Sequence, residues 1–103
     1  MFARVSTYRM EDPGKLVEGF EGVTNPLEGM AGFAGAYFLV DRDGGRALSI
    51  TLWESEETLD AGAEKANELR RNAVAGAGSI ESVDHYEVAV TVGAGAAAAG
   101  RST

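Results

Sequence analysis

The chain has 103 residues, with 9 Lys and Arg against 16 Asp and Glu, one His and no Cys. This length suits a single domain, and the net charge of −7 disfavours nucleic acids and anionic membranes as partners, since both attract clustered Lys and Arg. The absence of Cys excludes disulfides, thiolate nucleophiles and Cys-ligated metal sites.

The first segments indicate a strand followed by a helix. Residues 2–9 mix β-branched and aromatic residues with polar ones at alternating positions, which predicts a strand. Asp12 is a good helix N-cap. Pro13 suits the first helical position, where its missing N–H would have no partner in any case.

The apolar residues of this helix recur at spacings of three and four, as on one face of an amphipathic helix. Gly19 and Gly22 together weaken it by about 2 kcal/mol relative to Ala. Pro26 removes a backbone donor while the apolar spacing keeps its phase, so we expect a kink or a restart there. The apolar face consists of Leu16, Phe20, Val23, Leu27 and Met30.

Residues 33–42 and 46–54 are predicted to form a β-hairpin around a Gly-rich turn at 43–45. The second strand alternates: one side carries Leu48, Ile50 and Leu52, and the other carries Ala47, Ser49, Thr51 and Trp53. The loop length is open. A loop of two or four residues would put Tyr37 and Leu39 on the leucine side, and a loop of three would put Phe38 and Val40 there.

A second amphipathic helix and a last strand complete the pattern. Ser55 is a suitable N-cap, and acidic residues follow it in the first turn, where the helix dipole favours negative charge. The buried side of this helix is expected to hold Leu59, Ala63, Ala66, Leu69 and Ala73, and Gly76 and Gly78 end it. Ile80–Val92 is predicted to be a long strand, with Tyr86 on one side and His85 on the other.

The domain is expected to cover residues 1–92. Residues 93–103 are rich in Gly and Ala and hold no large apolar side chain, which predicts a mobile tail. No apolar run approaches the ~20 residues of a membrane span, and the N-terminus lacks the pattern of a secretory signal peptide. We therefore expect a cytoplasmic protein without membrane contacts.

The order βαββαβ predicts an α+β, ferredoxin-like fold, with a four-stranded antiparallel sheet and two helices on one of its faces. We expect the uncovered face to carry Ala47, Ser49, Thr51 and Trp53. Such a face is too apolar for water in places and too polar for an ordinary core. A homodimer formed through this face, enclosing a partly polar cavity, would satisfy both requirements.

Two stretches carry a family resemblance. One is Ala31-Gly32-Phe33, which leads into the second strand, and the other is residues 47–57, in which Trp53 closes a strand before acidic residues open a helix. Over residues 2–92 the chain thereby resembles the dimeric α/β-barrel superfamily, specifically the antibiotic-biosynthesis-monooxygenase-like domains. The resemblance implies a dimeric α/β barrel and cofactor-independent oxygenation of a planar aromatic or quinone-like molecule.

The resemblance carries over to the residues only in part. Trp53 stands where the cofactor-free monooxygenases of this family have a Trp, but the Asn they use is missing from the first strand, where Ser6 and Thr7 stand. The haem-degrading branch needs an axial His on a helix, whereas the single His, His85, falls on a predicted strand. The chain is therefore expected to use neither a cofactor nor a metal ion.

The candidate catalytic residues are Trp53, as a wall on which a ring stacks, and His85, as a general acid or base. The substrate is expected between the helices and the open sheet face. Residues with hydroxyl groups are the candidates for binding it, namely Ser6, Tyr37, Ser49, Thr51 and Tyr86. Each of these residues also has an ordinary structural interpretation, so a non-catalytic dimeric module that binds a small ligand or another protein is the alternative function.

Overall fold

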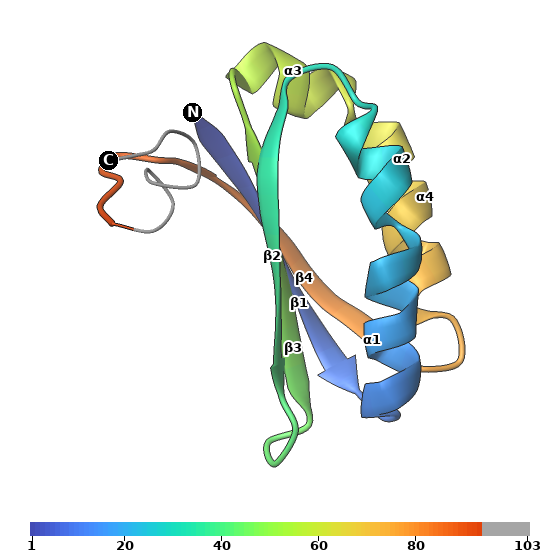
Figure 1. Cartoon of the computed structure of the whole chain (residues 1–103). Coiled ribbons are helices and arrows are strands. Elements are labelled where there is room, and N and C mark those ends of the chain that lie inside the picture. The colour runs from blue at the N-terminus through green and yellow to red at the C-terminus, as the bar shows by residue number, and fades with distance from the viewer. Residues whose placement is uncertain (94–103) are drawn as a thin grey trace.

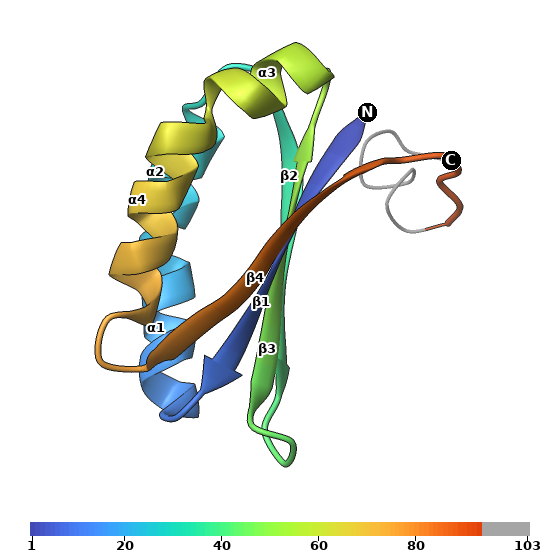
Figure 2. The same ribbon diagram turned by 180° about the vertical axis from the view of Figure 1, so that it is seen from behind.

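The computed structural model describes residues 1–93 and contains one four-stranded sheet, with strand order β2-β3-β1-β4 and antiparallel neighbours. Its elements are β1 (Phe2–Met10), α1 (Pro13–Gly22), α2 (Thr24–Glu28), β2 (Phe33–Asp41), β3 (Arg46–Trp53), α3 (Glu56–Ala61), α4 (Ala63–Val74) and β4 (Gly78–Glu87). All four helices lie on one face of the sheet (Figures 1 and 2). This confirms the ferredoxin-like α+β fold. Most of the expected mobile tail, residues 94–103, lies outside the described residues.

Each of the two predicted helices is divided into two segments. The side chain of Asp12 accepts a hydrogen bond from the Lys15 backbone N–H at 3.1 Å, which confirms the predicted N-cap. The chain restarts as α2 at Thr24, so Pro26 lies in the first turn of the new helix, where it needs no N–H partner. The second helix is interrupted at Gly62, between α3 and α4. No helix among residues 1–93 is long and apolar enough to span a bilayer.

The hairpin has a four-residue loop, because Asp41 pairs with Arg46 across it. Tyr37 consequently lies opposite Ile50, which is the outcome predicted for a loop of even length. The Asp41 carboxylate accepts a hydrogen bond from the Gly44 backbone N–H and forms an ion pair with Arg46 at 3.0 Å. Both contacts lower the pKa of the Asp41 carboxyl group, the hydrogen bond from Gly44 more strongly.

The two faces of the sheet are the reverse of those predicted, so that expectation was wrong. The helices cover the side of β3 that carries Ala47, Ser49, Thr51 and Trp53, whose exposed fractions are 2%, 5%, 9% and 0%. Leu48, Ile50 and Leu52 point to the uncovered side and are partly exposed. The reason is packing: Leu16, Phe20 and Leu59 of the helices share this core with the large Trp53 ring, and the small Ala47, Ser49 and Thr51 leave room for them.

We call the uncovered side the open face. The strand register places Val5 beside Ile50 and Ala3 beside Leu52, with Tyr37 and Tyr86 on the flanking strands. The exposed fractions of Tyr37 and Tyr86 are 47% and 56%. The open face is therefore largely apolar and lies in solvent in the single chain.

The last strand is shorter than predicted and ends at Glu87. Its neighbour β1 begins at Phe2, so the pairing runs out, and the final contact is a hydrogen bond from the Val88 backbone N–H to the Met1 carbonyl at 2.9 Å. Residues 88–93 extend past the sheet on the side away from the helices (Figures 1 and 2). Val90 and Val92 are largely exposed there.

Candidate functional site

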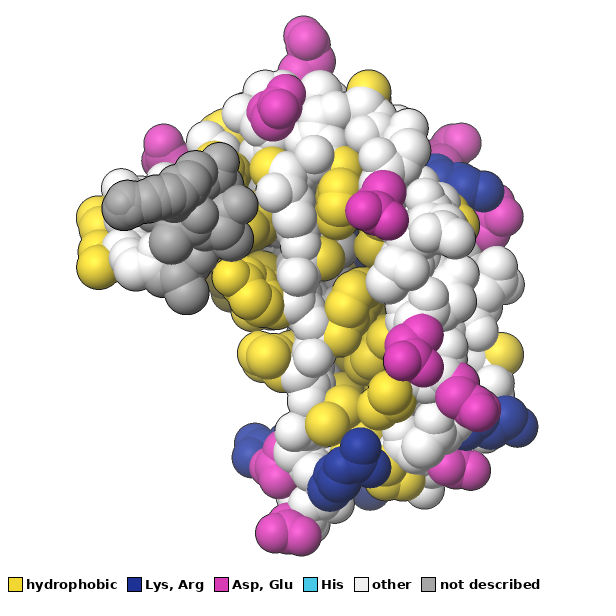
Figure 3. Space-filling model, in the orientation of Figure 1, with side chains coloured by type: hydrophobic (Ala, Val, Ile, Leu, Met, Phe, Trp, Pro, Cys, Tyr) yellow, Lys and Arg dark blue, Asp and Glu magenta, His cyan; other side chains and the backbone are white. Residues whose placement is uncertain are grey.

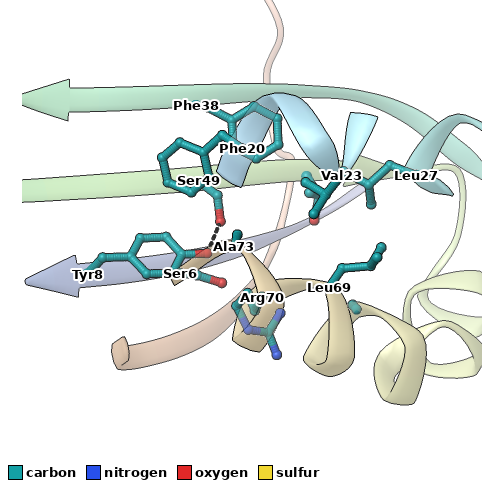
Figure 4. Close-up of a pocket in the computed structure, with 12 residues that line it drawn as sticks. Ser6, Tyr8, Phe20, Val23, Leu27, Phe38, Ser49, Leu69, Arg70 and Ala73 are labelled. Carbon is teal, nitrogen blue, oxygen red and sulfur yellow. Dashed lines mark hydrogen bonds between the residues drawn. The ribbon is translucent and has the colours of Figure 1, made fainter. Parts of the chain in front are cut away.

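A cavity of about 30 Å³ lies between the sheet and the helices (Figure 4). Such a volume holds about one water molecule. Its apolar lining comes mainly from α1, α2, β2 and α4, namely Phe20, Val23, Leu27, Phe38, Ala66, Leu69 and Ala73. Its polar lining comes from β1, β3 and α4, namely Ser6, Tyr8, Ser49, Thr51 and Arg70. The cavity thus combines aromatic walls with hydroxyl groups and one guanidinium.

The hydroxyl groups meet on the sheet side of the cavity. Tyr8 and Ser49 share a buried hydrogen bond of 2.7 Å between Oη and Oγ, and Ser6 lies next to them (Figure 4). Burial raises the pKa of the Tyr8 phenol, against the effect of its hydrogen bond to Ser49. Tyr8 is therefore a neutral phenol at physiological pH, able to donate or accept a hydrogen bond.

Two arginines, which the sequence analysis missed as site residues, lie on the helix-covered side. Arg70 of α4 lines the cavity and donates a hydrogen bond from Nη2 to Asn67 Oδ1. Arg4 of β1 donates from Nη2 to the Leu59 carbonyl at 2.6 Å and from Nε to His85 Nε2 at 3.3 Å. Burial lowers the pKa of both guanidinium groups. The sequence held one indication of this for Arg4: it lies two residues before Ser6 on the same strand, so both side chains point to the same face of the sheet.

Trp53 is fully buried beside the cavity but is not one of its lining residues. Its indole Nε1 donates a hydrogen bond to Thr51 Oγ1 at 3.0 Å, and its ring meets Phe33 edge to face at a centroid distance of 5.7 Å. The Arg4 guanidinium lies 5.5 Å from the ring centroid of Trp53. Trp53 therefore touches the cavity only through Thr51.

The structure brings three of the predicted site residues together and separates the rest. Ser6, Ser49 and Thr51 line the cavity, and all three face the helices. Tyr37 and Tyr86 lie on the open face. His85 is exposed on β4 and reaches the interior only by accepting the hydrogen bond from Arg4.

A second hollow lies outside the cavity, between α1 and β2. It measures about 150 Å³ and is lined by Val17, Phe20, Glu21, Thr24, Phe38 and Val40. Phe20 and Phe38 line both spaces, and their rings pack at a centroid distance of 4.8 Å. Figure 3 shows the hydrophobic side chains gathered between β2 and the helices. A displaced Phe38 would therefore join the inner cavity to this outer groove.

Sequence comparison finds a relative for part of the chain. No protein-family model matches the chain. Over 63 residues it is 33% identical to the uncharacterized protein Rv2557 of Mycobacterium tuberculosis, and the match covers 61% of this chain but only 28% of that protein.

Solved structures resemble the chain over most of its length. SnoaB, a cofactor-independent oxygenase from Streptomyces nogalater, matches with a TM-score of 0.72 and 15% identity, over 88% of this chain and 95% of that one. The haem-degrader MhuD of Mycobacterium tuberculosis, with two haems bound, matches with a TM-score of 0.68 and 25% identity, over 90% of this chain and 100% of that one. The monooxygenase ActVA-Orf6 of Streptomyces coelicolor, in complex with nanaomycin D, matches with a TM-score of 0.62 and 21% identity, over 89% of this chain and 92% of that one. These matches confirm the predicted resemblance to antibiotic-biosynthesis-monooxygenase-like proteins.

The residues of this chain do not fit a haem. The single His is exposed on the strand β4 rather than carried by a helix, and its Nε2 accepts the hydrogen bond from Arg4. Within residues 1–93 no group of three or more His, Asp and Glu side chains is placed to hold a metal ion.

Proposed function

We propose that this chain, with the fold of the antibiotic-biosynthesis-monooxygenase-like proteins, binds a small planar aromatic or quinone-like molecule in the helix-side cavity and oxygenates it without a cofactor. The observation that carries the proposal is the composition of that cavity, whose lining combines the rings of Phe20 and Phe38 with the hydroxyls of Tyr8 and Ser49. The oxygenase activities given for SnoaB and ActVA-Orf6 support it.

Without a cofactor, the substrate itself must supply the electrons that reduce O2. An anthrone-like ring can do so: its ring CH2 group becomes a carbonyl, one oxygen atom of O2 stays in the product, and the other leaves as water with the two hydrogens. In a hydroquinone-like ring, a ring C–H becomes C–OH, the two phenols become carbonyls, and the second oxygen atom again leaves as water. In this scheme the aromatic rings hold the substrate plane, and the hydroxyls of Tyr8, Ser6 and Ser49 orient its oxygen atoms. Trp53 and His85 act as positioning residues, through Thr51 and Arg4 respectively.

Binding a ring requires the cavity to widen, because an aromatic ring needs roughly 150 Å³. The outer groove supplies that space on the far side of Phe38. Phe38 is only partly buried and belongs to the edge strand β2, so fewer neighbours hold it than hold Phe20. In this proposal the substrate enters between α1 and β2 and displaces the Phe38 ring.

The proposed assembly is a homodimer through the open face. Leu48, Ile50 and Leu52 form an apolar row there, and apolar patches of this kind are usually covered by a partner. A second copy presents the same row, which suits a two-fold symmetric contact. Tyr37 and Tyr86 then contact the second copy rather than substrate. The expected cytoplasmic location remains a prediction.

The dimer is tested by analytical ultracentrifugation of wild type and two charged variants. Ile50→Lys places a charge in the centre of the open face, whereas Asn72→Lys adds the same charge to an exposed position on α4. We expect Ile50→Lys to be monomeric and Asn72→Lys to sediment as the wild-type dimer. A wild-type monomer at micromolar concentration would contradict the proposed assembly.

The oxygenase activity is tested by O2 uptake with a panel of anthrones and hydroquinones. Ala66 is 5% exposed and lines the cavity, so the two added methyl groups of Ala66→Val occupy it. Ala61→Val adds the same groups to an exposed helical position. We expect uptake to be lost in the first variant and kept in the second, with both folded. Equal uptake in the two variants would move the reaction out of the cavity.

The alternative is a dimeric module that binds such a molecule without reacting. The specific observation in its favour is the cavity lining, which among the described residues contains no imidazole and no carboxylate to take a proton. Binding of an anthrone that Ala66→Val abolishes, together with no O2 uptake by the wild type, would identify this function.

A further inference from the structure

Two guanidinium groups are buried beneath the helices with hydrogen-bonding capacity left over. The exposed fractions of Arg4 and Arg70 are 2% and 9%. Arg4 Nη1 and Arg70 Nε are both buried and have no hydrogen-bond partner. A buried cation is costly unless an anion or a full set of hydrogen bonds compensates it, so these two atoms mark an unmet requirement.

No carboxylate within residues 1–93 forms a salt bridge with either arginine. The ion pairs found there, Arg46 with Asp41 and Lys65 with Glu68, are on the surface. The chain as a whole carries a charge of −7, yet none of its described acidic residues forms a salt bridge with these two cations, although Asp60 is near enough to Arg4 to raise its pKa against the larger effect of burial. The interior between the helices and the sheet is therefore electropositive in an acidic protein.

Arg70 connects this charge to the cavity. Its side chain extends from α4 to the space beside the hydroxyls of Ser6 and Tyr8 (Figure 4). Among the described residues, its side-chain hydrogen-bond partner is Asn67, one turn back on the same helix. Arg4 lies two residues before Ser6 on β1, and its side chain points to the same, helix-covered face of the sheet. The cavity consequently has a hydroxyl side on the strands and a cationic end towards α4.

We propose that the ligand of this cavity is an aromatic carboxylate, whose ring lies against Phe20 and Phe38 and whose carboxylate accepts hydrogen bonds from Arg70. A planar guanidinium matches a carboxylate in both shape and charge. Arg4 adds a second positive charge that favours the anion. This inference rests on the proposed function, because it requires the cavity to open for an aromatic ring, and it narrows the substrate to rings that carry an acid group.

The test compares two probes of the same shape by isothermal titration calorimetry at about pH 7, where a carboxylic acid is ionised. Naphthalene-2-carboxylate carries the charge, and naphthalene-2-carboxamide does not. We expect the wild type to bind the carboxylate at least about tenfold more tightly. Arg70→Met should remove most of this preference, leaving only the weaker effect of Arg4, and should leave the affinity for the carboxamide within about threefold.

Arg71→Met is the matched control, because it removes the same charge from the next, exposed position of α4. It should keep the preference for the carboxylate. Equal binding of both probes by the wild type, or equal effects of the Arg70 and Arg71 variants, would overturn this inference and leave the proposed function standing. If neither probe binds the wild type, both the inference and the proposed binding site are overturned.

A measurement on the wild type alone covers the case in which Arg70→Met fails to fold. A ligand that binds only the native state raises the melting temperature, and at equal concentration the tighter ligand raises it more, with the logarithm of its affinity. The carboxylate should raise it more than the carboxamide does at equal concentration. An equal rise with the two probes would overturn the inference.

Discussion

Two glycines of α1 should respond to alanine in opposite ways. Helix propensity alone favours Ala over Gly by up to about 1 kcal/mol at either position. At Gly22 an added Cβ has no atom within 4 Å, so most of this gain should be realised. At Gly19 the Cβ would lie 2.2 Å from the Ala73 carbonyl oxygen and 2.9 Å from its carbon, both of them backbone atoms of α4. Helix α4 cannot yield by rotating a side chain.

Overpacking of this kind costs about 1–3 kcal/mol, which outweighs the propensity gain at Gly19. We therefore expect Gly22→Ala to stabilise the protein by about 0.5–1 kcal/mol and Gly19→Ala to destabilise it by about 1–2 kcal/mol. Since each kcal/mol shifts the melting temperature by about 4–8 °C in a domain of this size, calorimetry at one protein concentration resolves the pair. A Gly19→Ala variant as stable as Gly22→Ala would refute the close contact of α1 with α4.

Three further variants test single contacts. Burial raises the pKa of the Tyr8 phenol, so the unfolded chain loses this proton at a lower pH than the folded protein does. The stability that the neutral phenol contributes is therefore complete below the unfolded pKa and is lost as the pH rises above about 10. Tyr8→Phe should lose less stability than wild type between pH 8 and 10.5 in urea titrations. Trp53→Phe should cost about 2 kcal/mol in urea unfolding, because it leaves a void and deprives the Thr51 hydroxyl of its donor. Ser55→Ala removes the capping box with Thr58 and should lower the melting temperature by the equivalent of about 1 kcal/mol; no change would mean that the cap is not formed in solution.

The order of elements followed from local chemistry that the sequence displays directly. Asp12 and Pro13 mark the start of α1, and the glycines after Asp43 mark the hairpin turn. The end of β4 could not be found this way, because it depends on where β1 begins and not on the valines that continue the pattern. Strand propensity says nothing about whether a partner strand is within reach.

The assignment of the sheet faces failed for a physical reason. Alternation along β3 separates Ser49 from Ile50, but it does not say which of them meets a helix. The packing of helix and sheet side chains against one another decides it, and this is a property of pairs of elements rather than of one.

The two arginines of the site were missed for the same reason, because the sequence of one strand does not say which of its sides the helices cover. A cation on a strand, such as Arg4, is normally exposed, and only the fold shows that it shares the interior with Arg70. The hydroxyls of Ser6, Ser49 and Thr51 line a cavity on the helix-covered side, not on the open face where they were expected, and their role in binding substrate stays a prediction.

The helices and the open face divide β1 and β3 between two tasks, so each strand behaves as two interleaved sequences. Ser49 belongs to the proposed ligand chemistry, whereas its neighbours Leu48 and Ile50 belong to the proposed assembly. Substitutions at even-numbered positions of β1, such as Ser6, can therefore change the substrate preference without disturbing the dimer. A single inserted residue within β3 is another matter: it would carry leucines into the binding chamber and serines onto the contact surface, and would disable both at once.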